Sequence, residues 1–282
     1  MYPPKFDYYR ASSVDEALSL LQTHTGAKLL AGGHSLLPAL KLRLADPGVL
    51  IDIGRIPQLK GIERRTGSVY IGALTTHAMV AAAEGLPAAL TEAAALIGDP
   101  AVRNRGTVGG NVAHADPASD LPTVLVALDA RFHVTGPGGA RTIPADDFFV
   151  DLFTTALQEG EILTGIEIPM DGDGSAYVKF ENPASRYALL GVAAALRVRD
   201  GRCIEARVAV GGLTPKATRA RAVEQALINQ PLDEQSLAEA AGRIDNDLGD
   251  DVMGDIHASA EYRRAVAPVF VQRALTLAAQ RA

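Results

Sequence analysis

The sequence predicts an α+β protein built from two parts. Up to residue 169, short apolar runs typical of strands alternate with helical patterns. The segment "MDGDGSA" (170–176) then interrupts this order with glycines and aspartates, as a link between domains does. Beyond it, three strand-like runs come first and the helical patterns follow, which is typical of an antiparallel sheet covered by helices. With 282 residues the chain is long enough for two domains.

The first part opens with a predicted helix in "SSVDEALSLLQTH", where Ser13 and Glu16 have the spacing of a capping box. The strand "AKLLAGG" follows and is broken by paired glycines. "SLLPALKLRLADP" is predicted to be helical, because Pro38 is tolerated in a first turn and Pro47 lies beyond the end. The remaining strands of this part are predicted in "VLIDIGRI", "SVYIGAL" and "EILTGIEIP", and its helices in "THAMVAAAEG" and "LPAALTEAAALIG".

The second part is predicted to contain strands and then helices. The strands are expected at 176–181, 187–199 and 203–211, and the helices near 219–229, 234–244 and 258–280. Cys203 is the only cysteine, so the chain holds no internal disulfide, no cysteine-based zinc site and no cysteine-ligated iron–sulfur cluster. Because it stands in the alternating pattern "RCIEARVAV", we expect a structural thiol.

Composition excludes several classes of function. Hydrophobic residues make up 48% of the chain and charged residues 21%, which is ordinary for a globular protein. The net charge of −6 and the lack of a long basic run argue against nucleic-acid binding. The charge-free run "YALLGVAAAL" (187–196) has about half the length that a bilayer requires, and the start lacks the apolar core of a signal peptide. We therefore expect no integral membrane segment and a cytoplasmic location.

The polar stretch "RNRGTVGGNVAHADPASD" (103–120) raises three possible chemistries. A metal site is not predicted, because none of the six His residues precedes Glu, and His114 with Asp116 lacks further ligands. A hydrolase is not predicted either, because Leu37 stands where a nucleophile elbow around Ser35 needs glycine. A phosphate site is the remaining possibility.

Two Gly–Gly pairs favour the phosphate site. Gly32–Gly33 ends the strand "KLLA", and Gly109–Gly110 follows "TV". Glycine permits positive φ and close backbone approach, so that consecutive N–H groups can converge on an anion, and nearby polar side chains can add donors. These side chains are Ser35, Thr107 and Asn111. The Rossmann fingerprint and the P-loop are both absent, so the residues alone leave diphosphate binding and two tight turns as alternatives.

Taken together, "AGGHSLLPALKLRLADPGVLIDI" and "RNRGTVGGNVAHADPASDLP" resemble the FAD-binding medium subunit of molybdenum hydroxylases, including carbon monoxide dehydrogenase-type enzymes and the flavin portion of xanthine dehydrogenase. The likeness extends over nearly the whole chain, from "FDYYRASSVDEALSLL" to "EYRRAVAPVFVQRAL". It implies a vanillyl-alcohol-oxidase (PCMH)-type FAD-binding domain over 1–172, with subdomains of about 1–56 and 57–172. Residues 173–282 would form a carbon monoxide dehydrogenase flavoprotein-type C-terminal domain with an antiparallel sheet and helices.

The resemblance also implies which residues contact FAD. The first glycine segment would wrap the diphosphate with Leu30, Ala31, Gly32, Gly33, His34, Ser35 and Leu36, and the second with Thr107, Val108, Gly109, Gly110 and Asn111. Asp120, Leu163 and Lys179 match further contact positions. The alternative for Leu163 is an ordinary core residue of a strand, and the alternative for Lys179 is a solvated lysine. Tyr187 falls where relatives place a tyrosine against the flavin ring, but Arg186 replaces their usual Asp, and ordinary core burial is its alternative.

The function that the resemblance implies is electron transfer. No catalytic acid or base is named, because no group of residues in the sequence demands one, and no metal is expected in this chain. Electrons would pass from partner iron–sulfur clusters through FAD to an external acceptor. The partners would be a small iron–sulfur subunit and a large molybdopterin subunit, in a dimer of heterotrimers. A self-contained flavin-dependent oxidoreductase and a non-redox nucleotide-binding module are the alternatives. The organic substrate and the final acceptor, whether NAD, a quinone or oxygen, stay open.

Overall fold

The N-terminal segment forms a three-stranded parallel sheet in the order β1-β3-β2, in a computed structural model that describes residues 2–282. Its strands are β1 (Asp7–Arg10), β2 (Lys28–Leu30) and β3 (Val49–Asp52). Helix α1 (Val14–Thr23) begins as predicted, with the Ser13 hydroxyl accepting from the Glu16 N–H at 3.1 Å. The Glu16 carboxylate accepts from the N–H of Ser12, one residue earlier than a capping box requires.

Helix α2 (Leu36–Lys41) is shorter than predicted and ends well before Pro47. The reason is a left-handed residue after the helix, Arg43, with φ of 60°. Its N–H donates to the Leu40 carbonyl, and the next N–H, of Leu44, donates to the Ala39 carbonyl. These two bonds close the helix end, so a proline was not needed to stop it.

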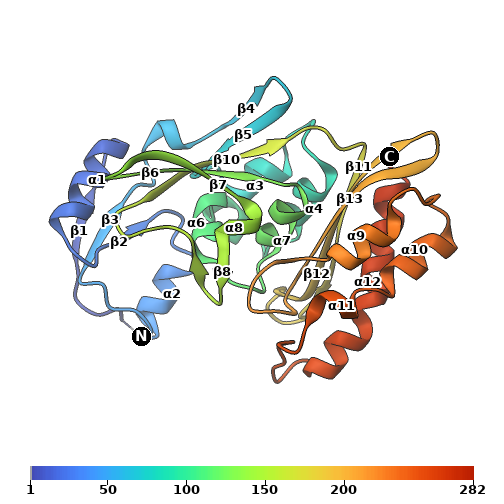
Figure 1. Cartoon of the computed structure of the whole chain (residues 1–282). Coiled ribbons are helices and arrows are strands. Elements are labelled where there is room, and N and C mark those ends of the chain that lie inside the picture. The colour runs from blue at the N-terminus through green and yellow to red at the C-terminus, as the bar shows by residue number, and fades with distance from the viewer. Residues whose placement is uncertain (1) are drawn as a thin grey trace.

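A five-stranded antiparallel sheet follows, in the order β4-β5-β10-β6-β7. Its strands are β4 (Ile62–Arg65), β5 (Ser68–Gly72), β6 (Arg131–Gly136), β7 (Gly139–Pro144) and β10 (Ile162–Pro169). Figure 1 shows α3, α4, α6 and α7 together beneath this sheet. The four helices are α3 (His77–Ala81), α4 (Ala88–Leu96), α6 (Val108–His114) and α7 (Asp120–Ala127).

Shorter elements complete this part of the chain. They are the 3₁₀ turn η1 (Pro57–Leu59), α5 (Pro100–Arg105), α8 (Ala145–Phe148) and the two-stranded hairpin β8 (Phe149–Asp151) with β9 (Thr154–Thr155). Helices α5 and α6 occupy much of the stretch 103–120, so this stretch is more regular than its polar, turn-prone composition suggested.

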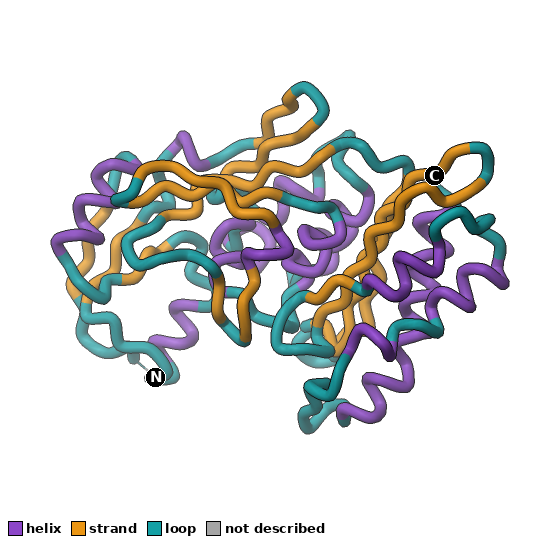
Figure 2. Tube along the Cα trace, in the orientation of Figure 1, coloured by secondary structure: helices purple, strands orange, loops and turns teal. Residues whose placement is uncertain are grey.

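The C-terminal part is a four-stranded antiparallel sheet in the order β11-β12-β13-β14, followed by helices, as predicted. Its strands are β11 (Gly174–Glu181), β12 (Ala188–Arg199), β13 (Arg202–Gly211) and β14 (Thr218–Arg219). Its helices are α9 (Arg221–Leu227), α10 (Glu234–Ala241), α11 (Asp245–Leu248) and α12 (Ala260–Ala279). Figure 2 shows these helices on the side of the sheet that faces away from the rest of the chain.

The two faces of the C-terminal sheet carry side chains of different size. Larger residues such as Leu190 and Val192 lie in the core shared with the C-terminal helices. Small residues such as Ala193 and Ala195 lie in the core shared with α4 and α7. This alternation, period two along a strand, lets α7 approach the sheet closely. At Gly211 a Cβ would stand 2.1 Å from the Thr123 hydroxyl oxygen, so only glycine fits there.

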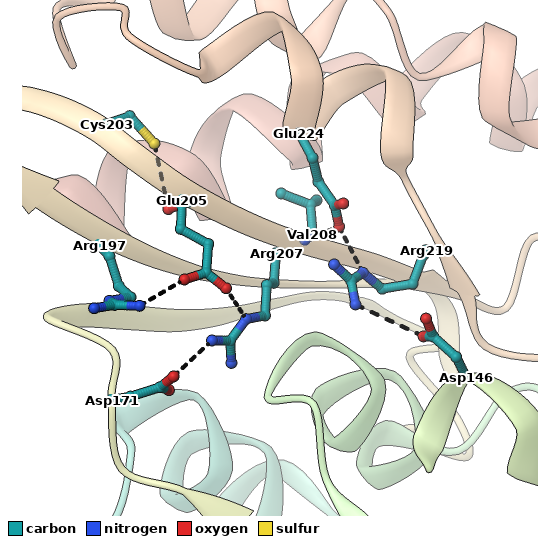
Figure 3. A network of polar contacts seen from close by, with 9 residues as sticks. All are labelled: Asp146, Asp171, Arg197, Cys203, Glu205, Arg207, Val208, Arg219 and Glu224. Carbon is teal, nitrogen blue, oxygen red and sulfur yellow. Dashed lines mark hydrogen bonds and ion pairs between the residues drawn. The ribbon is translucent and has the colours of Figure 1, made fainter.

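A polar network joins the C-terminal sheet to the preceding part (Figure 3). Arg207 on β13 contacts Asp171 at 2.9 Å, in the segment between β10 and β11. Arg219 on β14 contacts Glu224 at 2.6 Å and Asp146 of α8 at 3.7 Å. The buried Glu224 carboxylate also accepts from the backbone N–H of Val208 on β13, at 2.8 Å. These contacts fix the orientation of the sheet against α8 and the linking segment.

Cys203 lies fully buried on β13, where its thiol donates to the Glu205 carbonyl at 3.4 Å. Burial raises the pKa of this thiol, which disfavours the reactive thiolate and agrees with a structural role. Within residues 2–282, no group of three His, Cys, Asp or Glu side chains is placed to hold a metal ion. No helix in the same range is both long and apolar enough to cross a membrane.

Candidate functional site

The first glycine segment lies between β2 and α2. Gly33 has φ of 78°, a left-handed conformation that favours glycine. Gly32 lies against the backbone before the second segment: a Cβ there would stand 2.3 Å from the Arg105 carbonyl oxygen and 3.0 Å from Gly106 Cα. Both glycines are therefore required, one by its conformation and one by close approach.

The backbone N–H groups of this segment are available to a ligand. None of the N–H groups of residues 32–36 donates to a protein acceptor within the described part of the chain, whereas those of Leu37 and Ala39 donate to the Gly33 and Ser35 carbonyls. The Ser35 hydroxyl makes no capping bond to α2. His34 is exposed beside them, with Nδ1 3.3 Å from the Gly32 carbonyl oxygen. Consecutive free N–H groups at a glycine turn are the donors that an anion requires.

The second segment differs from the first. It is the start of α6 rather than a turn, and its N–H groups already have protein acceptors. Thr107 caps the helix by accepting from the Gly110 N–H at 3.2 Å, while the N–H groups of Val108 and Gly109 donate to the Thr75 and Ala73 carbonyls at 2.9 and 2.8 Å. The two glycine pairs, which look alike in the sequence, therefore differ in structure, and the first pair supplies the free backbone donors.

Glycine is nevertheless required at Gly109. A Cβ there would stand 2.5 Å from Ala73 Cβ, inside the core. Gly110 is exposed, and a Cβ there would meet Thr107 Oγ1 at 2.8 Å and Ala31 Cβ at 3.7 Å. The start of α6 thus lies beside the first turn, and the structure brings the two predicted segments together at Ala31 and Gly110.

His77 lies where the two segments meet, and sequence reasoning did not single it out. A Cβ on Gly106 would stand 2.7 Å from its Nε2, and its own N–H donates to the Gly106 carbonyl at 3.1 Å. The side chain is 3% exposed, and its Nδ1 has no hydrogen-bond partner among residues 2–282. Burial, together with the nearby His34, lowers the pKa of His77 to about 4. No motif in "TTHAMV" distinguishes it from an ordinary histidine at a helix start.

Asp120 and Lys179 form a buried ion pair between the two parts of the chain. Asp120 opens α7, Lys179 lies on β11, and Lys179 Nζ stands 2.9 Å from Asp120 Oδ1 with both side chains at most 6% exposed. Lys179 is therefore not the solvated lysine that was its alternative. Burial raises the pKa of Asp120, against the opposing effects of the Lys179 ammonium and of the Tyr177 hydroxyl. Tyr177 donates to Asp120 Oδ1 at 2.6 Å and was not predicted from the sequence.

The loop between α6 and α7 connects this pair to the second segment. Asn111 Oδ1 accepts from the Ser119 hydroxyl at 2.8 Å, immediately before Asp120. The Ala118 carbonyl accepts from the Ala188 N–H at 3.2 Å, which places Tyr187 at the same loop. Tyr187 is 47% exposed, so ordinary core burial, its alternative, is wrong.

Leu163 behaves differently from the other predicted residues. It lies on β10 opposite Val134, is 6% exposed and belongs to the core beneath the five-stranded sheet. The next carbonyl, of Thr164, accepts from the Ala73 N–H, and Ala73 is the residue on which Gly109 rests. The structure thus places Leu163 behind the second segment and shows the strand core environment that was its alternative.

Recesses of the surface lie elsewhere. One, of about 280 Å³, lies on the five-stranded sheet and is lined by residues that include Arg65, Tyr70 and His133. The other, of about 420 Å³, is lined by Val178 of β11 and residues of α12. Neither contains a predicted site residue. At the glycine segments themselves, the free N–H groups of residues 32–36 and the exposed Gly110 fit a diphosphate.

Comparisons with known proteins agree with this geometry. Residues 4–171 match the family described as FAD binding domain in molybdopterin dehydrogenase, and residues 175–278 match the CO dehydrogenase flavoprotein C-terminal domain. The carbon monoxide dehydrogenase medium chain of Hydrogenophaga pseudoflava is 41% identical over 99% of this chain and 98% of its own length. The 6-hydroxypseudooxynicotine dehydrogenase complex subunit alpha of Paenarthrobacter nicotinovorans is 39% identical, over 100% and 97%.

Solved structures give the same result. Carbon monoxide dehydrogenase from Hydrogenophaga pseudoflava, in a form lacking the Mo-pyranopterin moiety, matches with a TM-score of 0.95 at 41% identity, over 100% of this chain and 99% of that chain. Quinoline 2-oxidoreductase from Pseudomonas putida 86 matches with a TM-score of 0.92 at 32% identity, over 99% of each chain.

Proposed function

Because this chain belongs to the FAD-binding flavoproteins of the molybdopterin dehydrogenase family, we propose that it is the electron-transfer subunit of a molybdenum hydroxylase complex. It binds FAD, and its relatives are subunits of dehydrogenase complexes. FAD supplies the redox chemistry, and the protein binds and orients the cofactor. The finer proposal is that electrons enter this FAD from partner iron–sulfur clusters and leave to an external acceptor.

The observation that carries the binding mode is the first glycine segment. In this proposal the free N–H groups of residues 32–36 hold the diphosphate, and the exposed Gly110 lets the cofactor approach. The ion pair of Asp120 and Lys179 lies near the flavin end of the cofactor in this proposal, and the half-exposed Tyr187 contacts the flavin ring. Leu163 would support the site from the core. No side chain here is assigned a proton-transfer role.

The proposal also concerns how the chain is divided. We propose an FAD-binding domain over residues 1–172, with subdomains of about 1–56 and 57–172, and a C-terminal domain over 173–282. The family matches to 4–171 and 175–278 support this division. The two subdomains would correspond to the parallel and the five-stranded sheets, which meet where Gly32 contacts Gly106.

The partners follow from what this chain lacks. Cys203 is the only cysteine and is buried, so the chain cannot ligate an iron–sulfur cluster through cysteines. Relatives named as a medium chain and as a complex subunit are parts of larger assemblies. We therefore propose a small iron–sulfur subunit and a large molybdopterin subunit as partners. A dimer of heterotrimers and a cytoplasmic location are part of the proposal through the family resemblance alone.

Reconstitution tests the proposal. The purified chain should take up one FAD and show a flavin absorption band after desalting, whereas a non-redox module that binds another nucleotide would stay colourless. The variant Gly32→Ala should lose the flavin, because its Cβ would displace the Arg105 backbone that lies against the first turn. A wild-type chain that stays folded but colourless with excess FAD would refute the proposal.

A further inference from the structure

Tyr177 reaches the FAD site from the edge strand of the C-terminal sheet. Tyr177 and Lys179 are two residues apart on β11, so their side chains leave the same face of the sheet. In the neighbouring strand, Lys179 pairs with Gly191, where a Cβ would stand 2.4 Å from the Tyr177 hydroxyl oxygen. Because Gly191 has no side chain, the Tyr177 hydroxyl can occupy the space above it and contact Asp120 of α7.

One hydrogen bond of the Tyr177 hydroxyl is found in the part of the chain that the structure describes. The hydroxyl donates to Asp120 Oδ1 at 2.6 Å, and no other hydrogen bond of this hydroxyl occurs within residues 2–282. Lys179 Nζ contacts the same carboxylate at 2.9 Å to Oδ1 and 3.0 Å to Oδ2, and it also donates to the Leu96 carbonyl at 3.3 Å. Tyr177 is 4% exposed, so water does not compete for this bond.

The Asp120 carboxylate needs both donors because it is buried. Burial disfavours the ionised form of a carboxylate, and charge-assisted hydrogen bonds to its oxygens stabilise that form. Two donors of different origin also fix the carboxylate plane, since Lys179 alone offers a flexible ammonium. Without the tyrosine, Asp120 would rest on one partner and could rotate or take up a proton.

We propose that Tyr177 is a positioning residue of the FAD site, whose hydroxyl holds the Asp120 carboxylate in place beside Lys179. This inference rests on the proposed role of Asp120 as a cofactor contact. Tyr177 acts through Asp120 and needs no contact with FAD itself. The consequence is a specific dependence: the effect of the hydroxyl on FAD must vanish when the Asp120 carboxylate is absent.

A double-mutant cycle in the full chain tests this dependence. FAD affinity is measured by flavin fluorescence, and the environment of the bound flavin by its visible absorption spectrum, in wild type, Tyr177→Phe, Asp120→Ala and the double variant. We expect Tyr177→Phe to weaken FAD binding about tenfold, as loss of a hydrogen bond to a charged group does, and to shift the flavin spectrum. In the Asp120→Ala background, which leaves the hydroxyl no side-chain acceptor at residue 120, the same change should have less than about a twofold effect and leave the spectrum unaltered.

Further variants separate positioning from simple packing. Gly191→Ala keeps the hydroxyl but displaces it, so it should reproduce the spectral shift of Tyr177→Phe, also if the latter folds poorly. Tyr70→Phe is the matched control, because its hydroxyl lies over Gly165 of the five-stranded sheet and not at Asp120. Equal effects of Tyr177→Phe in both Asp120 backgrounds, or unchanged affinity and spectrum, would overturn the inference. A wild-type chain without FAD would instead refute the proposed function.

Discussion

Gly110 and Gly109 are adjacent, and we predict opposite consequences when a methyl group is added to each. Gly110 is exposed and helical, so Gly110→Ala gains up to about 1 kcal/mol of helix propensity. It also crowds Thr107 Oγ1 at 2.8 Å, and loss of that cap costs about 1 kcal/mol. The two effects offset each other, so the apoprotein should keep its stability.

Gly109→Ala acts on the core instead. Its Cβ would stand 2.5 Å from Ala73 Cβ and 2.8 Å from Ala73 Cα, which is overpacking worth about 1–3 kcal/mol. Binding of FAD should respond differently. The methyl group added by Gly110→Ala would stand on the surface beside Ala31, where the cofactor is proposed to lie. It should weaken FAD binding at least about tenfold, or 1.4 kcal/mol.

Thermal melts of the apoproteins and FAD titrations by fluorescence separate these effects. We expect Gly110→Ala to melt near the wild type and bind FAD poorly, and Gly109→Ala to melt at a lower temperature. If Gly110→Ala binds FAD as tightly as the wild type, the cofactor does not pass over the start of α6, and our placement of the diphosphate is wrong.

Three further predictions concern stability. The depression of the pKa of His77 from 6.5 to about 4 means that the folded state takes up a proton less readily than the unfolded state, so the free energy of unfolding should fall by about 3 kcal/mol between pH 7 and pH 4. Urea unfolding at both pH values should show a smaller fall in His77→Gln, and an equal fall would assign the acid sensitivity to other groups. Asp120→Asn should cost about 3–5 kcal/mol because it leaves buried Lys179 unpaired, and adding Lys179→Met should recover much of this; a double variant as unstable as the single one would contradict the pairing. Finally, FAD at about a hundred times its dissociation constant should stabilise the chain by about 2.7 kcal/mol, so coincident melts with and without FAD would count against a native-state site.

Local sequence signals predicted the elements well where the cause is local. The Ser13 cap fixes the start of α1, and the continuous apolar run "ALLGVAAAL" lies in the predicted strand 187–199, which is β12 and is buried on both faces over this run. The end of α2 was missed because a left-handed Arg43, which no residue preference signals, closes it before Pro47. The second part was predicted in the right order because strand and helix periodicities are read over short windows.

The site could be predicted only in part. Gly32–Gly33 and Gly109–Gly110 look alike in sequence, yet the N–H of Gly109 is already bound by Ala73, which only the tertiary fold brings there. The ion pair of Asp120 and Lys179 joins residues 59 apart, and it was expected as two separate contacts, from resemblance alone. His77 and Tyr177 carry no sequence signal, because a lone histidine or tyrosine in an apolar segment is ordinary.

Anaerobic reduction of the bound FAD tests most directly whether this chain relays electrons. The FAD-loaded chain is mixed with the organic substrate of the complex in the absence of oxygen, and the flavin absorption band is followed before and after the partner subunits are added. We predict that the band persists with this chain alone and bleaches once the iron–sulfur and molybdopterin subunits are present. Rapid bleaching by substrate without partners would contradict the relay and identify a self-contained flavin-dependent oxidoreductase.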